Sequence, residues 1–203
     1  MPLLRSVFGP SKKEIWSNVA KDIGGEFKDG GFWGKDGLRY SSGQWELLLD
    51  TYTISNGKTT TTYTRLRTPF INKDGLYFKI YRSGIFSRMG SFLGMQDIQI
   101  GDHLFDQDFI IKGNNEEKIR LLFSDERLKS LIKQQPRISV VVKDDEGFFS
   151  KSYPNGVDLL QFQCLGVIKD AQVIKDLFDL FSCILERLVQ LDSAYEDDPG
   201  IKL

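Results

Sequence analysis

Hydrophobic and polar residues alternate on both sides of an Asn-Gly pair, and this pattern predicts a long β-hairpin from Gln44 to Phe70. Asn56-Gly57 is a strong hairpin signal, because a two-residue type I′ loop needs positive φ at both central positions. Pairing would then run outward from Ser55 and Lys58. The register that follows pairs Leu47 with Leu66, Glu46 with Arg67, and Asp50 with Tyr63.

The two faces of this hairpin differ in character. One face carries apolar residues that we expect in the core, namely Trp45, Leu47, Leu49 and Leu66. The other face carries charged and aromatic residues, namely Glu46, Asp50, Tyr52, Tyr63, Arg65 and Arg67. Opposite charges and aromatic rings that face each other across strands stabilise a sheet. We therefore predict that this second face is exposed to solvent and held by cross-strand pairs.

The remaining pattern predicts helices and further strands. Ser11-x-x-Glu14 is a capping box, and the apolar spacing after it predicts an amphipathic helix that ends at Gly24-Gly25. A third strand follows the hairpin, from Leu76 to Tyr81. The later elements are a strand from Phe105 to Lys112, two short helices capped by Asn115 and by Ser124 or Asp125, a strand around Val140, a strand from Val157 to Ile168, and a helix from Asp170 to about Leu191.

Together these elements predict an α+β fold. Its largely antiparallel sheet consists of an N-terminal meander with the Asn-Gly hairpin and a later β-α-α-β-β-α unit, and an N-terminal and a long C-terminal helix cover it. Residues 1–191 form a single domain, and residues 192–203 form an acidic, flexible tail. The predicted core residues are Trp16, Trp45, Leu47, Leu66, Phe78, Ile110, Val140, Phe162, Leu177, Phe181 and Leu188.

Composition narrows the class of protein. The chain has 203 residues, of which 40% are hydrophobic and 27% charged, as in ordinary folded proteins. Its formal net charge of -1 gives no overall attraction to nucleic acid or to an anionic membrane. No apolar run approaches the roughly 20 residues that a membrane span requires, so stable membrane insertion is not expected.

The two cysteines, Cys164 and Cys183, lie in apolar patterns of a strand and a helix. We expect both to be buried and unpaired, which favours a reducing compartment. Residues 1–13 lack the apolar stretch of a secretory signal. These observations predict a cytoplasmic protein.

Most catalytic motifs are absent from the sequence. His103 is the one histidine, which excludes multi-histidine metal sites. A Cys-His dyad with Cys164 or Cys183 stays formally open, but their apolar surroundings favour a structural role. The glycine-rich stretch from Gly30 to Gly37 lacks the Lys-Ser/Thr ending of a phosphate-binding loop. The sequence predicts no bound cofactor.

Three neighbouring carboxylates, Asp102, Asp106 and Asp108, form the best candidate for a metal site. Oxygen ligands two residues apart on a strand share a face and can bind a divalent cation that activates water. A metal-assisted hydrolase or transferase is therefore an alternative function. Carboxylates at the start of a strand more often cap turns, and we favour that role here.

Basic and aromatic residues on the hairpin, namely Tyr52, Tyr63, Arg65 and Arg67, are of the types that bind single-stranded nucleic acid. Glu46 and Asp50 interleave with them, which favours a solvated face over nucleic-acid binding.

The segment from Gly84 to Met95 is rich in glycine and apolar residues. We expect it to pack on the meander and not to bind vesicles. Its alternative role is contact with a membrane surface or a protein partner, through Ile85, Phe86, Met89, Phe92 and Leu93.

Apolar residues cover more than half of the circumference of the last helix. Such a helix lies across a sheet or is shared with a partner, in a complex or a homo-oligomer. With few catalytic motifs in the chain, we expect a non-enzymatic binding or scaffolding module.

Several short motifs together resemble a bacterial family of uncharacterised proteins, and the likeness covers nearly the whole chain. They are Gly31-Phe32-Trp33, Asp50-Thr51-Tyr52-Thr53, Gly94-Met95-Gln96-Asp97, Gly101-Asp102, the stretch from Phe105 to Gly113, and the stretch from Ala194 to Pro199. The middle motif is also similar to a wider bacterial domain of unknown function, some of whose members are membrane-anchored. The resemblance implies no catalytic residue and mildly favours a role near a membrane.

Overall fold

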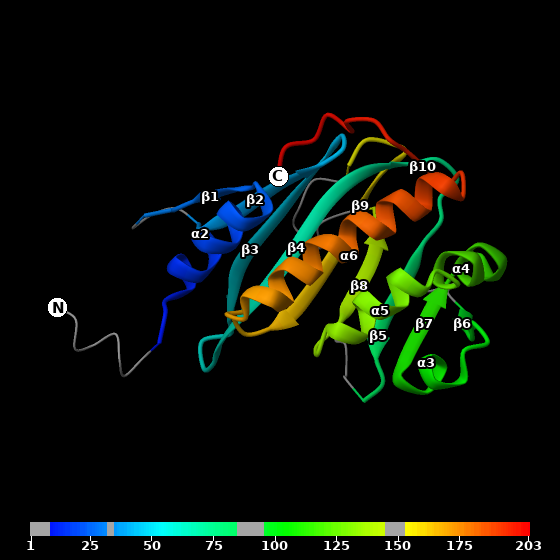
Figure 1. Ribbon diagram of the computed structural model, residues 1–203, viewed down its shortest axis with the longest axis horizontal. Helices are drawn as coiled ribbons and strands as arrows, with labels where there is room; N and C mark the ends of the chain where they lie inside the picture. Colours follow the sequence, from blue (N-terminus) through cyan, green and yellow to red (C-terminus); the bar gives the residue numbers. More distant parts are fainter. Residues whose placement is uncertain (1–8, 32–34, 85–95, 145–152) are drawn as a thin grey trace.

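The computed structural model describes residues 9–31, 35–84, 96–144 and 153–203 (Figure 1). The helices are α2 (Lys12–Ile23), α3 (His103–Asp108), α4 (Glu116–Phe123), α5 (Glu126–Gln134) and α6 (Ala171–Gln190). The strands are β1 (Glu26–Lys28), β2 (Gly37–Ser42), β3 (Trp45–Ser55), β4 (Thr60–Asn72), β5 (Phe78–Arg82), β6 (Gln96–Ile98), β7 (Phe109–Gly113), β8 (Ser139–Lys143), β9 (Val157–Leu165) and β10 (Ala194–Tyr195).

The described strands form one sheet in the order β1-β2-β3-β4-β9-β8-β5-β7-β6, with β10 paired to β4. Each of these pairs is antiparallel. Helices α2, α5 and α6 lie against one face, and α6 crosses the central strands diagonally (Figure 1). The predicted α+β class with a long C-terminal helix is confirmed.

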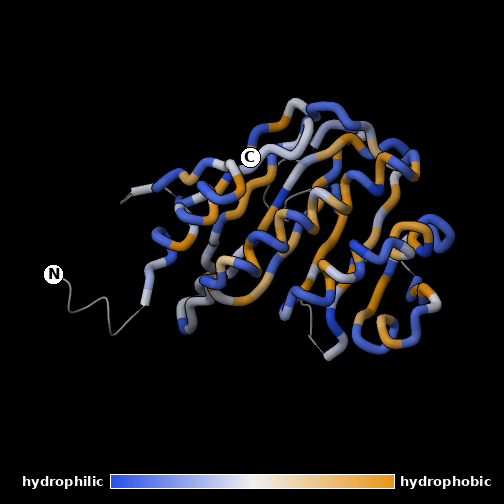
Figure 2. Tube along the Cα trace, in the orientation of Figure 1, coloured by the Kyte–Doolittle hydropathy of each residue, from blue (hydrophilic) through white to orange (hydrophobic). Residues whose placement is uncertain are grey.

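A row of apolar side chains crosses the sheet and carries the core. Register places one residue from each of eight strands in this row: Leu38, Leu49, Leu66, Phe162, Val140, Ile80, Ile111 and Ile98. All are buried. Figure 2 shows the same concentration of hydrophobic residues in the central strands and in α6.

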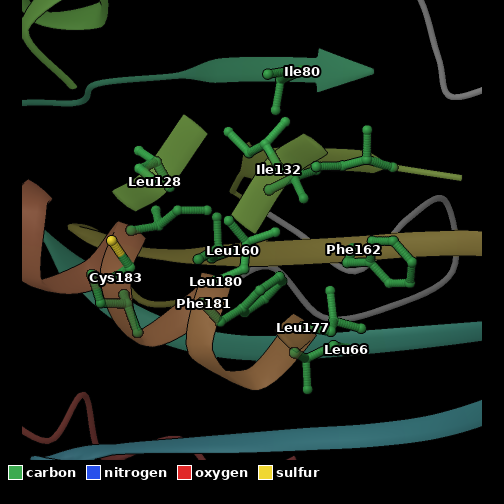
Figure 3. Packing of buried hydrophobic residues seen from close by; sticks show 14 of the residues in the cluster. Leu66, Ile80, Leu128, Ile132, Leu160, Phe162, Leu177, Leu180, Phe181 and Cys183 are labelled. Atoms are coloured by element: carbon green, nitrogen blue, oxygen red, sulfur yellow. The ribbon is translucent and has the colours of Figure 1, made fainter. Parts of the chain in front are cut away.

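Helix α6 buries its apolar stripe against this row. Leu177 lies beside Leu66, and Phe181 lies between the helix and β9 (Figure 3). Both side chains are fully buried. Truncating a buried Phe to Ala typically costs about 3–5 kcal/mol, so this contact is a main source of stability. The remaining apolar face of α6 is also buried, at Ile174, Phe178, Leu180, Ile184, Leu185 and Leu188.

The predicted helix boundaries follow from local caps and are confirmed. Ser11 and Glu14 make the capping box of α2, and Gly24 ends the helix with φ of 72°. Asn115 caps α4, Asp125 caps α5, and Asp170 caps α6. Each accepts a hydrogen bond from a backbone amide in the first helical turn, a group that has no partner inside the helix.

The hairpin exists, but its predicted register is wrong by two residues. Leu49 pairs with Leu66, Asp50 with Arg65, and Tyr52 with Tyr63. The turn is centred on Gly57-Lys58, because the Asn56 amide donates to the Thr59 carbonyl at 3.2 Å. Gly57 has φ of 81°, and neither Asn56 nor Lys58 has a positive φ. Glycine at the first central position is the pattern of a type II′ turn, which replaces the expected type I′.

The predicted strand from Phe105 to Lys112 is wrong in its first half. Asp102 caps α3, which spans His103–Asp108, and β7 starts only at Phe109. Phe109 and Ile111 then face the core, which leaves Ile110 half-buried on the other face. The core prediction is therefore wrong for Ile110, and every other predicted core residue is buried.

Residues 192–203, predicted as a flexible tail, begin with a short strand. Ala194 pairs with Asn72, and Tyr195 pairs with Ile71. Ala194 is only 4% exposed, so burial of a small apolar side chain accompanies this pairing. Near the C-terminus, Arg39 Nη2 donates to the Leu203 carbonyl at 2.6 Å.

Candidate functional site

The side chains that point away from α6 form a second face of the sheet. Across β3, β4 and β9, Tyr52, Tyr63 and Leu165 make one row of this face. Asp50, Arg65 and Gln163 make the next row. The prediction of a solvent face is wrong for the row of Asp50 and for the neighbouring row that contains Arg67. Asp50 is 5% exposed, and Arg67 is 4% exposed.

Two arginines hold Asp50. Arg65 Nε donates to Asp50 Oδ1 at 2.6 Å, and Arg65 Nη2 donates to Oδ2 at 2.9 Å. Arg67 Nη2 donates to the same Oδ2 at 2.8 Å. Removing one member of a buried ion pair typically costs about 3–5 kcal/mol, because the partner charge loses its counter-ion. The cluster therefore fixes the middle of the β3–β4 hairpin.

The tyrosines of the neighbouring row stack on each other. The ring centroids of Tyr52 and Tyr63 are 5.3 Å apart with an interplanar angle of 17°. The Arg65 guanidinium carbon lies 4.9 Å from the centroid of the Tyr52 ring. Partial burial raises the pKa of Tyr52. The bidentate arginine thus links the buried ion pairs to a rigid aromatic surface.

Beyond the row of Tyr52 and Tyr63, the β3–β4 hairpin projects from the sheet. Pairing of β2 with β3 ends at Asp50, and pairing of β9 with β4 ends at Tyr63. We call residues 51–62 the arm; its part from 53 to 60 is exposed. Ile54 is 51% exposed, and Leu165, beside Tyr63, is 56% exposed. We call the surface made by Tyr52, Ile54, Tyr63 and Leu165 the arm face.

The arm face suits protein contacts better than nucleic acid. Asp50 neutralises the cations next to it, Arg65 and Arg67, at hydrogen-bond distance. Tyr52 and Tyr63 use one ring face each for their mutual stack, which reduces the surface open to a base. Tyrosine and arginine on rigid strands are instead enriched at protein interfaces.

The structure does not bring the three candidate metal ligands together. Asp102 Oδ1 accepts from the Phe105 amide, and its Oδ2 accepts from Lys129 Nζ at 2.8 Å. This ammonium lowers the pKa of Asp102. Asp106 accepts from the amides of Ile100 and Gly101. These two carboxylates position a helix and a turn.

Asp108 is the third of these aspartates and is exposed. Its Oδ2 lies 3.9 Å from Arg82 Nη1. Among residues 9–31, 35–84, 96–144 and 153–203, no group of three or more His, Cys, Asp or Glu side chains is placed to hold a metal ion.

The histidine and the cysteines do not combine into a site. His103 is exposed in the first turn of α3. Cys164 and Cys183 are free and buried. Burial raises the pKa of each thiol to about 11, so neither carries appreciable thiolate at neutral pH.

A buried serine with a lysine neighbour has the residue types of a catalytic dyad. Lys118 Nζ donates to Ser193 Oγ at 3.1 Å and to Asp74 Oδ2 at 2.5 Å. A general base must accept the serine proton, and an ammonium in an ion pair with a carboxylate has no lone pair for it. The cluster instead joins α4 to the end of α6. Its residues come from three distant segments of the chain, so no sequence motif could predict the cluster.

Ten residues line a shallow pocket of about 180 Å³ between the β2–β3 turn and the last residues of the chain. Trp45, Pro69, Pro199 and Lys202 are among them. Pockets for small ligands usually have about 300–1,000 Å³. This hollow is therefore too small to indicate a ligand site.

Two predicted contact surfaces have different outcomes. The membrane or partner contact through Ile85, Phe86, Met89, Phe92 and Leu93 lies outside the described residues. The C-terminal helix buries its apolar stripe in the core of its own chain, so that stripe is not free for a partner. Among the described residues, no helix is both long and apolar enough to cross a membrane.

Among solved structures, the chain is similar to the structure of a mycobacterial protein. It is the crystal structure of the mycobacterial trehalose monomycolate transport factor A, TtfA. The two chains are 10% identical and superpose with a TM-score of 0.49, over 87% of this chain and 94% of that chain. No family model matches the sequence, and no curated protein matches it. The resemblance to an uncharacterised bacterial family stays a prediction.

Proposed function

We propose that this chain is a non-enzymatic protein-binding module and that the arm face is its contact surface. One observation carries the proposal: Ile54 and Leu165, two large apolar side chains that are more than half exposed, lie on the same face of the sheet as the Tyr52–Tyr63 stack. Burying a large apolar side chain contributes about 1.5–3 kcal/mol, so covering these two side chains would favour the binding of a partner.

The geometry of the arm supports the same conclusion. Binding hot spots combine aromatic residues and arginine on surfaces that lose little conformational freedom. The Asp50 ion pairs hold Arg65 in place, and the ladder between β3 and β4 holds both tyrosines. A partner would therefore meet a surface that is already ordered.

The alternative of a metal-assisted hydrolase or transferase has less support, because Asp102 and Asp106 use their oxygens to accept from backbone amides. A peripheral membrane role through residues 84–95 rests on a segment of which the structure describes only Gly84. A cytoplasmic location fits the two free cysteines, which a reducing compartment keeps unpaired.

Affinity purification with matched variants tests the proposal. We expect wild-type protein to retain at least one cellular protein that the double variant Tyr63→Ser, Leu165→Ser loses by about tenfold or more, a change of about 1.4 kcal/mol. The control variant is Leu104→Ser, Leu121→Ser, which removes exposed leucines from α3 and α4. It should retain that protein.

Calorimetry with the purified partner should then reproduce the same order of affinities. If every protein retained by the wild type binds the arm-face variant equally well, the arm face is not a contact surface. Circular dichroism would verify that both double variants are folded.

A further inference from the structure

The arm has a free strand edge in addition to its apolar face. The Asn56 amide points to β4, where it donates to the Thr59 carbonyl. Successive residues of a strand point their backbone groups to opposite sides, so Ile54 and Tyr52 also point to β4. Thr53 and Ser55 then point their amides and carbonyls away from β4. Within the described residues no strand pairs with this outer edge beyond Asp50, and Thr53, Ile54 and Ser55 are all exposed.

This edge lacks the features that usually prevent strand pairing. Proteins protect edges with charged residues, proline or very short strands. The terminal strands of the sheet follow that rule: β1 has three residues and carries Glu26 and Lys28, and β6 has three residues and carries Asp97. The arm edge, by contrast, has the uncharged sequence Thr51-Tyr52-Thr53-Ile54-Ser55 within a strand of 11 residues.

We propose that the outer edge of the arm pairs with the same edge of a second copy of this chain, antiparallel and about a two-fold axis at Ile54. In this register Thr53 faces Ser55 of the other copy and exchanges two backbone hydrogen bonds with it, and the symmetric pair does the same. Ile54 faces its own copy in a pair without hydrogen bonds between the two residues, where side chains are closest. Isologous pairing of this kind is the commonest symmetry of soluble oligomers.

The pairing fits a second copy because the edge is self-complementary. It places two β-branched side chains together and a threonine against a serine, pairs that stabilise antiparallel strands. No charge faces a like charge, because residues 51–55 carry none. Ile54, now 51% exposed, would be covered by its counterpart. The contact is small, so the dimer is expected to be weak and to form as the protein concentration rises.

Disulfide trapping tests this register. Residues opposite each other in such a pair have Cα atoms about 4.5 Å apart, within the range that a disulfide bridges. The variant Ile54→Cys should therefore form a covalent dimer under mild oxidation. The native Cys164 and Cys183 are buried, so they should not contribute. The control is Thr61→Cys. Thr61 lies opposite Ile54 on the same face, but it belongs to β4, the other strand of the arm.

Equal cross-linking of the two cysteine variants, or none by Ile54→Cys at concentrations up to about 1 mM, would overturn the proposal. Sedimentation equilibrium gives a second measurement that needs no cysteine. Wild-type protein should shift from one chain toward two with concentration, and Thr53→Pro should not, because it removes an outward-pointing amide without breaking the β3–β4 ladder. The matched control Thr60→Pro removes an amide from the opposite edge of the arm and should still dimerise.

The dimer shares Ile54 with the arm face but does not use Tyr63 or Leu165. Adding Tyr63→Ser and Leu165→Ser to Ile54→Cys should leave the trapping unchanged. Either proposal can therefore fail alone.

Discussion

At the residue scale, Asp158 is a buried carboxyl that accepts hydrogen bonds from two neutral side chains. It is 5% exposed. Asn72 Nδ2 donates to its Oδ2 at 2.5 Å, and the Tyr77 hydroxyl donates to its Oδ1 at 3.3 Å. Burial raises the pKa of Asp158, and the nearby charge of Asp144 raises it further. Burial likewise raises the pKa of Tyr77, to about 12, so the phenol stays protonated and keeps donating.

We predict that Asp158 makes folding less favourable as its carboxyl ionises. Its pKa is higher in the folded than in the unfolded chain, so the contribution to stability is fully present below the unfolded pKa of about 3.9. It is lost as the pH rises through the folded pKa. The variant Asp158→Asn should therefore gain stability relative to the wild type between about pH 3 and pH 7.

Urea unfolding at several pH values would measure this difference. Asp179→Asn, at an exposed position of α6, controls for the loss of one negative charge. A stability difference for Asp158→Asn that stays constant with pH would show that the carboxyl titrates alike in both states.

Residue patterns predicted burial well where alternation alone decides it. Trp45, Leu47 and Leu66 are buried as the hairpin pattern indicated. The ion pairs of Asp50 could not be predicted, because they depend on a register that differs by two residues from the expected one. A shift of two residues keeps every side chain on its face, so the apolar face was correct although the cross-strand partners were wrong.

At the element scale, Asn56 explains where the hairpin turns. Its Oδ1 accepts from the Thr59 amide at 2.8 Å, from the Lys58 amide at 3.1 Å and from Thr59 Oγ1 at 3.0 Å. A side-chain acceptor of this kind stabilises a turn two or three residues ahead of it. Asn56 is thus the residue before the turn centre, and Gly57 supplies the positive φ.

We predict that Asn56→Ala lowers the free energy of unfolding by about 1 kcal/mol, because the amides of Lys58 and Thr59 lose their protein acceptor. Asn56→Asp keeps the acceptor and should stay close to the wild type. Asn56→Gly would favour a type I′ loop, yet it should be destabilising here for the same reason as alanine. Chemical unfolding of the three variants measures these effects; a stabilising Asn56→Gly would favour the two-residue loop at Asn56-Gly57 instead.

Elements whose ends are set by local hydrogen bonds were predictable, and those set by distant contacts were not. Asp170 caps α6 within its own turn. The mistaken strand at Phe105 is a mixed case, because Asp102 caps α3 locally but the helix also depends on more distant contacts. Helix α3 is held by Lys129 of α5, which donates to Asp102, and by Phe105 and Phe109, whose ring centroids are 4.6 Å apart. Such partners are far away in sequence or depend on packing.

At the scale of the whole molecule, one core runs from one end of the sheet to the other. Leu38 of β2 and Ile111 of β7 belong to the same row of buried side chains, although five strands separate them. Helix α6 packs across the middle of this row, and both α2 and α5 contact it. A single cooperative unit is therefore expected, and one domain for residues 1–191 stays a prediction.

The tryptophans offer a direct test of that cooperativity. All three, Trp16, Trp33 and Trp45, occur in the first 45 residues of the sequence, and Trp16 and Trp45 are buried at the β1–β3 end of the sheet. The fluorescence of Trp16 and Trp45 therefore reports on one end of the sheet, whereas far-ultraviolet circular dichroism reports on the whole molecule. Ile111 lies toward the other end and is 2% exposed.

We predict that Ile111→Ala shifts both signals to the same lower melting temperature. The substitution should cost about 2–5 kcal/mol, and each kcal/mol lowers Tm by about 2–4 °C in a chain of this size. Ile54→Ala, the same change at an exposed position, should move Tm by little, because surface substitutions usually stay within about 0.5 kcal/mol. If Ile111→Ala lowered the circular dichroism transition and left the tryptophan transition in place, the two ends of the sheet would unfold separately.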